Sequence, residues 1–222
     1  MKFIVEYPVV STPGGGWLEP ANITRFARVA EEAGLYGIRF TDHPGPSLKW
    51  LNGGGHETFD PFAALAFCAA VTTRIRLLTW LSVVPYRNPF LAAKSMTTVD
   101  LLSGGRATFA LGSGYLRSEF AALGVDFAER NHLFEESVQV MKATWAGEEV
   151  RFQGRHFEAL GQVGMPLPVQ RPTTKQQAAA NDRLRAANCA KHTFSCDWPK
   201  LSESLNGLKK LFSSTSAKDK RS

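Results

Sequence analysis

The first two-thirds of the chain alternates short apolar runs of strand character with stretches in which apolar residues recur at helical spacing. Each predicted helix must carry the chain back along a face of the sheet before the next strand begins, so four strand–helix units in a row predict a parallel sheet. The candidate folds are a doubly wound sheet and a (β/α)8 barrel. The predicted strands cover residues 2–10, 38–41, 75–84 and 107–111, and the predicted helices cover residues 22–33, 62–71, 89–102 and 126–146.

Three of the predicted helices have recognisable starts. Asp60-Pro61-Phe62 and Asn88-Pro89-Phe90 each place a capping side chain before a proline in the first helical turn. Asp126 and Glu129 have the spacing of a capping box, which predicts a helix that begins at Asp126. These starts make the strand–helix repeat regular.

Nucleotide-binding motifs are missing where a doubly wound sheet would carry them. The first predicted strand is not followed by G-x-G-x-x-G, and no G-x-x-x-x-G-K-[ST] loop occurs. The residues after Val10 read Ser-Thr-Pro-Gly-Gly-Gly, and the proline is unsuited to a dinucleotide-binding turn. The sequence therefore favours the barrel.

In a parallel barrel the loops that follow the strands share one face, and that face holds the active site. Asp42-His43 follows the second predicted strand, Thr79 to Pro85 covers the end of the third, and Gly112-Ser113-Gly114-Tyr115 follows the fourth. A histidine at such a position can act as a general acid or base near neutral pH. Glycines allow the backbone to approach a flat ring or a phosphate.

A structural role is the alternative at each of these positions. Asp42 can cap the loop that follows it, and His43 can form its hydrogen bonds inside that loop. The Gly112-Ser113-Gly114 segment is also compatible with a plain tight turn. The residues alone leave both interpretations open.

The net charge of +6 arises entirely after Pro172, because basic and acidic residues are equal in number up to that point. Aromatic residues do not alternate regularly with the charges of the basic segment, so we expect no nucleic-acid partner. Three cysteines suit a reducing compartment, and the chain has neither a signal-peptide core nor 18 uninterrupted apolar residues. We therefore expect a cytoplasmic protein without a membrane partner.

An ordered set of motifs between Met1 and Pro172 resembles the bacterial-luciferase-like flavin and deazaflavin oxidoreductases, and most of all the branch that uses the deazaflavin coenzyme F-420. The motifs that carry the resemblance are Thr41-Asp42-His43-Pro44, Thr58-Phe59-Asp60-Pro61-Phe62, Thr72-Thr73-Arg74-Ile75-Arg76-Leu77, Pro85-Tyr86-Arg87-Asn88-Pro89, Leu102-Ser103-Gly104-Gly105-Arg106, Leu111-Gly112-Ser113-Gly114-Tyr115, Glu119-Phe120-x-x-Leu123-Gly124, Gly154-Arg155-His156-Phe157 and Pro168-Val169-Gln170-Arg171-Pro172.

The resemblance implies a (β/α)8 barrel whose cavity holds the flavin or deazaflavin ring, with hydride passing to or from the ring or with reduced flavin reacting with oxygen. It implies that Asp42 and His43 are catalytic, with His43 in proton transfer. It makes Thr79 and Trp80 cofactor-binding residues, at a bulge with a cis non-prolyl peptide behind the ring. It places the cofactor-binding residues Gly112, Ser113 and Gly114 near the ring and its tail. Tyr115 stands where some members carry an acidic catalytic residue, which argues against sugar oxidation.

The resemblance fades after residue 172. Residues 173–182 contain no β-branched apolar residue in place of the fifth barrel strand, so we expect a partial barrel over residues 1–172 and a diverged, basic, helical or irregular tail over residues 173–222. A truncated gene or a frame disturbance near Thr173 would explain this shift in charge and pattern. An open barrel exposes a sheet edge and an apolar inner face, which predicts a homo-oligomer.

Cys189, His192 and Cys196 have the spacing of a zinc-site fragment but no obvious fourth ligand, so we expect no metal. Three functions stay open: F-420-dependent hydride transfer to or from a small organic substrate, an FMN-dependent monooxygenase, and a non-catalytic barrel remnant that oligomerises.

Overall fold

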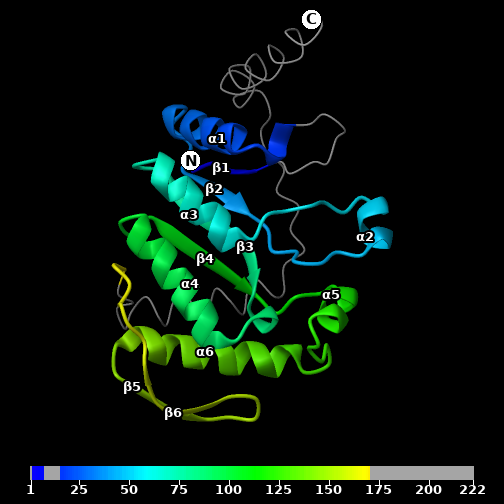
Figure 1. Ribbon diagram of the computed structural model, residues 1–222, viewed down its shortest axis with the longest axis vertical. Coiled ribbons are helices and arrows are strands. Elements are labelled where there is room, and N and C mark those ends of the chain that lie inside the picture. The colour runs from blue at the N-terminus through cyan, green and yellow to red at the C-terminus, as the bar shows by residue number, and fades with distance from the viewer. Residues whose placement is uncertain (1, 8–15, 171–222) are drawn as a thin grey trace, which may run out of the picture. The chain divides into compact units, whose positions relative to one another are not determined.

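The computed structural model of the 222-residue chain describes residues 2–7 and 16–170. Its main sheet consists of four parallel strands that lie side by side in chain order (Figure 1). A doubly wound sheet reverses its strand order part-way, whereas a barrel adds each strand beside the last. The order therefore confirms the predicted partial (β/α)8 barrel. The strands are β1 (Ile4–Glu6), β2 (Gly37–Phe40), β3 (Arg76–Val83) and β4 (Ala107–Gly112).

Three helices connect these strands and cover one face of the sheet (Figure 1): α1 (Pro20–Glu32), α3 (Pro61–Val71) and α4 (Pro89–Leu102). Two of their starts are as predicted. The carboxylate of Asp60 accepts from the backbone N–H groups of Phe62 and Ala63, each at 3.0 Å, and Asn88 accepts from the N–H of Phe90 at 3.0 Å. Each cap satisfies N–H groups that have no partner inside the helix.

The hydrophobic core lies between the sheet and these helices. Burial of each large side chain there contributes roughly 1.5–3 kcal/mol to folding. On the opposite face of the sheet Trp80 keeps 47% of its surface exposed, so the described residues leave that face uncovered. Core side chains with almost no exposed surface include Ile38, Phe40, Leu65, Leu77, Met96 and Val99.

The capping box at Asp126 is wrong. Helix α6 (Arg130–Ala146) begins four residues later than predicted. Asp126 accepts instead from the backbone N–H of Ala128 at 2.8 Å, which forms a local turn before the helix. Glu129 turns away from the helix start because its carboxylate contacts His156 and Arg155. The ion pairs of Glu129 with Arg155 and His156 therefore take the place of the predicted capping hydrogen bond.

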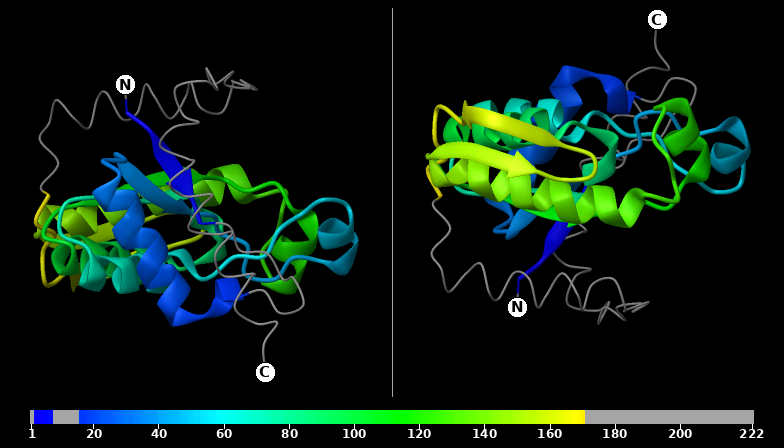
Figure 2. Two further views of the ribbon diagram at one scale, coloured as in Figure 1. Left: turned by 90° about the horizontal axis from the view of Figure 1, so that it is seen from above. Right: turned by 90° about the horizontal axis from the view of Figure 1, so that it is seen from below.

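Besides the single-turn 3-10 helices η1 (Gly16–Leu18) and η2 (Val84–Tyr86), four elements of the described residues were not expected from the sequence. Two are the short helices α2 (Leu48–Asn52) and α5 (Arg117–Ala122), which lie in the loops after β2 and β4. The other two are β5 (Glu149–Gln153) and β6 (Glu158–Val163), which pair antiparallel and lie along α6 (Figure 2). The carboxylate of Glu136 in α6 holds the turn of this hairpin by accepting from the backbone of Arg155 and His156 at 2.8 and 2.9 Å.

Several expectations fall outside the described residues. The first predicted strand is described only up to Tyr7, and the loop from residue 8 to 15 is not described. The predicted diverged tail and the zinc-site fragment at Cys189 also lie outside. Along the described ranges no helix combines the length and apolar character that crossing a bilayer requires.

Candidate active site

The predicted site residues meet at one end of the sheet, where the loops after β2, β3 and β4 emerge together with α2 and α5 (Figure 1). Asp42 and His43 follow β2, Trp80 lies in the second half of β3, and Gly112 ends β4. Because the strands are parallel, their carboxyl ends share this edge. The structure thus brings together the segments that the sequence singled out.

Asp42 is a buried anchor for the loop after β3. Its carboxylate accepts two hydrogen bonds from Arg87, at 2.6 and 3.0 Å, and one from the backbone N–H of Val83 at 3.0 Å. Arg87 also donates to Asp60, the cap of α3, at 2.8 Å. Burial by itself lowers the pKa of Arg87, but the hydrogen bonds and charges of Asp42 and Asp60 outweigh burial and raise it. Both oxygens of Asp42 are therefore engaged in holding the backbone.

His43 contacts a buried carboxylate that belongs to a distant part of the chain. Its Nδ1 lies 3.2 Å from Oε2 of Glu119 in α5. The side chain of His43 is 9% exposed and that of Glu119 is 0% exposed. Tyr86 donates to the same Oε2 at 2.9 Å, and the backbone N–H of Gly45 donates to Oε1 at 3.3 Å. The carboxylate of Glu119 therefore connects the loop after β2, the segment after β3 and helix α5.

Aromatic rings surround His43 on its remaining sides. The imidazole centroid lies 4.7 Å from the ring of Trp50 in α2 and 5.2 Å from the ring of His56. Tyr115 stands edge-on to His43 at 6.1 Å and is 63% exposed. His56 is held in turn by Thr41, whose Oγ1 lies 3.0 Å from its Nε2. His43 therefore packs among aromatic rings, and the exposed Tyr115 lies on the solvent side of this group.

Trp80 and Leu81 form an exposed apolar surface on the uncovered face of the sheet. The peptide bond between them is cis, and the pairing of β3 with β4 shifts register between Thr79 and Ser82, as the resemblance implied. The guanidinium of Arg39 lies over the Trp80 ring, 4.6 Å from its centroid. Cation–π contacts of this kind orient an exposed ring.

Thr79 lies beneath this surface. It is fully buried, and its hydroxyl donates to the carbonyl of Ala110 in β4 at 2.9 Å. This contact bridges the two strands beside the register shift. The side chain of Thr79 therefore supports the exposed segment and does not form part of its surface.

The two glycines after β4 are required by close packing. A side chain at Gly112 would bring its Cβ to 2.6 Å from Leu81 Cδ1. Gly114 has a φ of +80°, and a Cβ there would lie 2.7 Å from Val83 and 2.8 Å from Phe120. Ser113, between them, is partly buried. The loop can lie close to β3 and α5 only because glycine stands at both positions.

The family model of the luciferase-like monooxygenases matches residues 1–189. The chain belongs to this luciferase-like family. A curated relative, the F-420-dependent glucose-6-phosphate dehydrogenase of Amycolatopsis mediterranei (strain U-32), is 33% identical over 146 residues, which make up 63% of this chain and 42% of the relative. The enzyme of the same name from Gordonia bronchialis is 29% identical over 160 residues, or 68% of this chain and 45% of the relative. The matches span less than half of each curated relative.

Solved structures share the luciferase-like barrel fold. The monooxygenase RslO1 from Streptomyces bottropensis superposes with a TM-score of 0.69 at 28% identity, over 84% of this chain and 57% of that protein. The coenzyme F-420-dependent tetrahydromethanopterin reductase of Methanopyrus kandleri gives a TM-score of 0.57 at 20% identity, over 77% and 47%. At that lower identity the likeness concerns the fold alone.

Two polar groups of this luciferase-like site escaped the sequence-based prediction of site residues. Glu119 and Tyr86 were recognised only as parts of motifs, and neither was assigned a role. Burial and the hydrogen bond to Glu119 raise the pKa of Tyr86 far above that of a free tyrosine, so its hydroxyl stays protonated and donates. Burial and the charge of Glu119 also raise the pKa of Tyr115. Glu119 lies 76 residues from His43 in the sequence, so its place in a motif was the signal available there.

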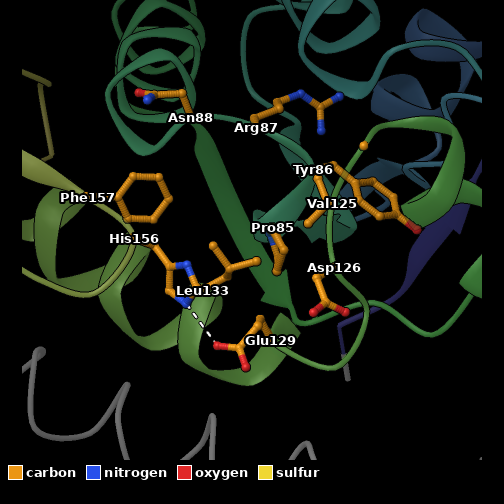
Figure 3. A pocket seen from close by; sticks show the side chains of 11 residues that line it. Pro85, Tyr86, Arg87, Asn88, Val125, Asp126, Glu129, Leu133, His156 and Phe157 are labelled. Atoms are coloured by element: carbon orange, nitrogen blue, oxygen red, sulfur yellow. Dashed lines mark hydrogen bonds and ion pairs between the residues drawn. The ribbon is translucent and has the colours of Figure 1, made fainter.

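The luciferase-like chain also has a cavity of about 380 Å³ between the segment after β3, the start of α6 and the turn of the β5–β6 hairpin (Figure 3). His156 and Glu129 meet at its wall, with 3.1 Å between Nε2 and Oε2. The hydroxyl of Tyr86 points away from His156 in this view (Figure 3). None of the predicted site residues lines this cavity.

Proposed function

We propose that the chain forms part of an oxidoreductase that binds coenzyme F-420 and that His43 transfers a proton to or from a small organic alcohol or carbonyl substrate. The observation that carries the proposal is the buried contact between His43 and Glu119 at the carboxyl ends of the strands. The F-420-dependent dehydrogenases among the relatives support the choice of cofactor.

The residues at this edge of the sheet fit a flat tricyclic ring. Trp80 and Leu81 present apolar surface, with exposed fractions of 47% and 42%, and Gly112 carries no side chain beside Leu81. Flat apolar surfaces with a few polar groups suit ring-shaped ligands. When bound, the deazaflavin supplies hydride transfer, while the protein supplies binding, orientation and electrostatics.

His43 is the residue suited to move a proton. Histidine is the side chain most often used as a general acid or base in enzymes, and the imidazole of His43 lies next to exposed aromatic surface from Tyr115. Asp42 takes a supporting role in this proposal because Arg87 and Val83 occupy its oxygens. It fixes the loop from which His43 projects.

An FMN-dependent monooxygenase is the second candidate function. The monooxygenase RslO1 is similar over 84% of this chain, and a 3,6-diketocamphane monooxygenase from Pseudomonas putida, solved in complex with FMN, shares the fold at 17% identity and a TM-score of 0.61. The same flat apolar surface suits either ring. Consumption of oxygen distinguishes the monooxygenase from the dehydrogenase.

Titration of the purified chain with F-420 and with FMN, followed by absorbance and fluorescence, tests the proposal. We expect saturable binding of F-420. Trp80→Ala should weaken it, whereas Leu160→Ala, which removes an exposed apolar side chain of the hairpin, should leave it unchanged. Binding of FMN with oxygen uptake supports the second candidate. A stable chain that binds neither cofactor contradicts both and supports a non-catalytic remnant.

The remaining expectations about partners stay predictions. Light scattering of the purified chain measures its molar mass and so tests the predicted homo-oligomer. The expected lack of nucleic-acid and membrane partners, and the cytoplasmic location, require binding and fractionation experiments.

A further inference from the structure

Glu119 is the most completely buried acidic side chain at the site and has no exposed surface. Its carboxylate contacts His43, the backbone of Gly45 and the hydroxyl of Tyr86. We propose that Glu119 is a positioning residue that holds neutral His43 in the tautomer with the proton on Nδ1, so that Nε2 presents a free lone pair. Its consequence for turnover rests on the proposed function, whereas the tautomer itself does not.

The hydrogen bonds of Glu119 determine which atom carries the proton. Oε1 receives the backbone N–H of Gly45, and Oε2 receives the hydroxyl of Tyr86, which burial keeps protonated. A carboxylate that already faces donors at both oxygens acts as an acceptor. The 3.2 Å contact from Oε2 to Nδ1 of His43 therefore requires the hydrogen on Nδ1.

The tautomer sets the chemistry of the other ring nitrogen. In neutral imidazole one nitrogen donates and the other accepts, so a proton on Nδ1 leaves the lone pair on Nε2. Nε2 lies on the side of the ring away from Glu119. Carboxylates that hold a histidine in this manner also stabilise its protonated form once it has taken up a proton.

Other charged and titratable groups around His43 do not replace Glu119. Asp42 is adjacent in the chain but is paired with Arg87. His56 and Tyr115 meet His43 through ring contacts at 5.2 and 6.1 Å and not through hydrogen bonds to its nitrogens. In the part of the chain that the structure describes, Glu119 is the carboxylate recorded in contact with His43.

Glu119→Gln provides a nearly isosteric test. The amide oxygen should turn toward the N–H of Gly45, because a backbone N–H can only donate. The amide NH2 then faces Tyr86 and Nδ1 of His43, and both the tyrosine oxygen and an unprotonated Nδ1 can accept from it. The substitution should therefore move the proton of neutral His43 from Nδ1 to Nε2.

The experiment is long-range ¹H–¹⁵N NMR of the full chain labelled at histidine, recorded at a pH at which the ring is neutral, with the His43 signals assigned by loss in His43→Gln. We expect the Nδ1–H pattern in the wild type and a shift toward Nε2–H in Glu119→Gln. A wild-type spectrum with Nε2–H overturns the inference even if the variant fails to fold.

Glu129→Gln is the matched control. Glu129 also contacts a histidine through a carboxylate, at 3.1 Å from His156, but it lies at the cavity beside the β5–β6 hairpin and not at His43. The substitution Glu129→Gln should change the NMR signals of His156 and leave those of His43 unchanged. An equal change at His43 in both variants contradicts a specific role for Glu119.

With F-420 and a substrate bound, Glu119→Gln should lower kcat by no more than the roughly 10²- to 10⁴-fold that a general acid–base group contributes, and change KM little. Wild-type turnover and an unchanged kcat in the variant overturn the positioning role. No turnover in the wild type, together with the expected tautomer, contradicts the proposed function and supports the assignment of Glu119.

Discussion

The guanidinium of Arg87 donates two hydrogen bonds to the buried carboxylate of Asp42, at 2.6 and 3.0 Å. The same guanidinium donates to Asp60 at 2.8 Å. One side chain thus joins the end of β2, the segment after β3 and the first turn of α3. The loop that carries His43 is held in place from three elements, so its geometry depends on Arg87.

Arg87→Ala should destabilise the fold by about 3–5 kcal/mol, because it leaves Asp42 as an unpaired buried charge. Arg87→Lys should recover only part of this, since lysine cannot form the two parallel hydrogen bonds. Urea unfolding measures both. Arg151→Ala, which breaks the exposed pair with Glu149, is the control and should cost under about 1 kcal/mol. Equal losses for Arg87→Ala and Arg151→Ala would show that the buried pair of Arg87 with Asp42 stabilises the fold no more than an exposed ion pair does.

Glu31 should make stability depend on acid pH. Partial burial pushes the pKa of Glu31 upward, but the backbone N–H groups of Ile75, Arg74 and Thr73 outweigh it and lower the pKa to about 2 from an ordinary 4.5. A carboxyl whose pKa is depressed by folding stabilises the fold above its unfolded pKa and loses that stabilisation as the pH falls. The loss should therefore occur between about pH 4.5 and 2.

Glu31→Gln tests this dependence. We expect it to lower the free energy of unfolding by on the order of 1 kcal/mol at pH 7, because solvent still partly screens this half-buried group, and to have little effect near pH 2. Urea unfolding across this pH range gives the comparison. Glu32→Gln, on the exposed side of the same helix, should leave the pH dependence unaltered. A constant difference between wild type and Glu31→Gln at every pH would refute the explanation.

Local signals allowed the starts of α3 and α4 and the position of His43 to be predicted. Asp60 and Asn88 cap their helices through atoms two or three residues away, so the pattern is complete within the segment. His43 was predicted because it follows a strand in a parallel array. The order β1-β2-β3-β4 then required only that each strand be placed beside the previous one.

Long-range contacts explain what could not be predicted. Glu119 meets His43 across 76 residues of sequence, so no local pattern pairs them. The capping box failed because Glu129 is drawn to His156, 27 residues further along. The β5–β6 hairpin escaped notice because β5 buries only Val150 and leaves charged residues exposed on either side. Tertiary contacts override local preference at each of these places.

Gly114→Ala should destabilise the loop after β4. The added Cβ would meet Val83 and Phe120 at under 3.0 Å, in a backbone conformation with φ of +80° that alanine adopts at a cost. We expect a loss of about 1–3 kcal/mol by thermal unfolding. Gly45→Ala is the matched control, because no atom lies within 4 Å of a Cβ there. Similar losses at both positions would contradict the packing explanation.

His43→Ala should separate proton transfer from binding. General acid–base groups typically contribute 10²- to 10⁴-fold to rate, so we expect turnover to fall by about that factor. Cofactor affinity should change little, because the exposed surface of Trp80 and Leu81 lies on β3 and stays intact. Steady-state kinetics and cofactor titration of the same preparations give the two quantities.

The control for His43→Ala is His132→Ala, which removes an exposed imidazole from α6. It should change neither turnover nor cofactor binding. Trp50 lies 4.7 Å from His43, so loss of the imidazole also removes packing, and His43→Gln, which restores side-chain volume but no group for proton transfer, separates the loss of volume from the loss of the proton-transfer group. If His43→Gln and His43→Ala both turn over at the wild-type rate, His43 has no part in the chemistry, and the proton must come from another group at the carboxyl ends of the strands.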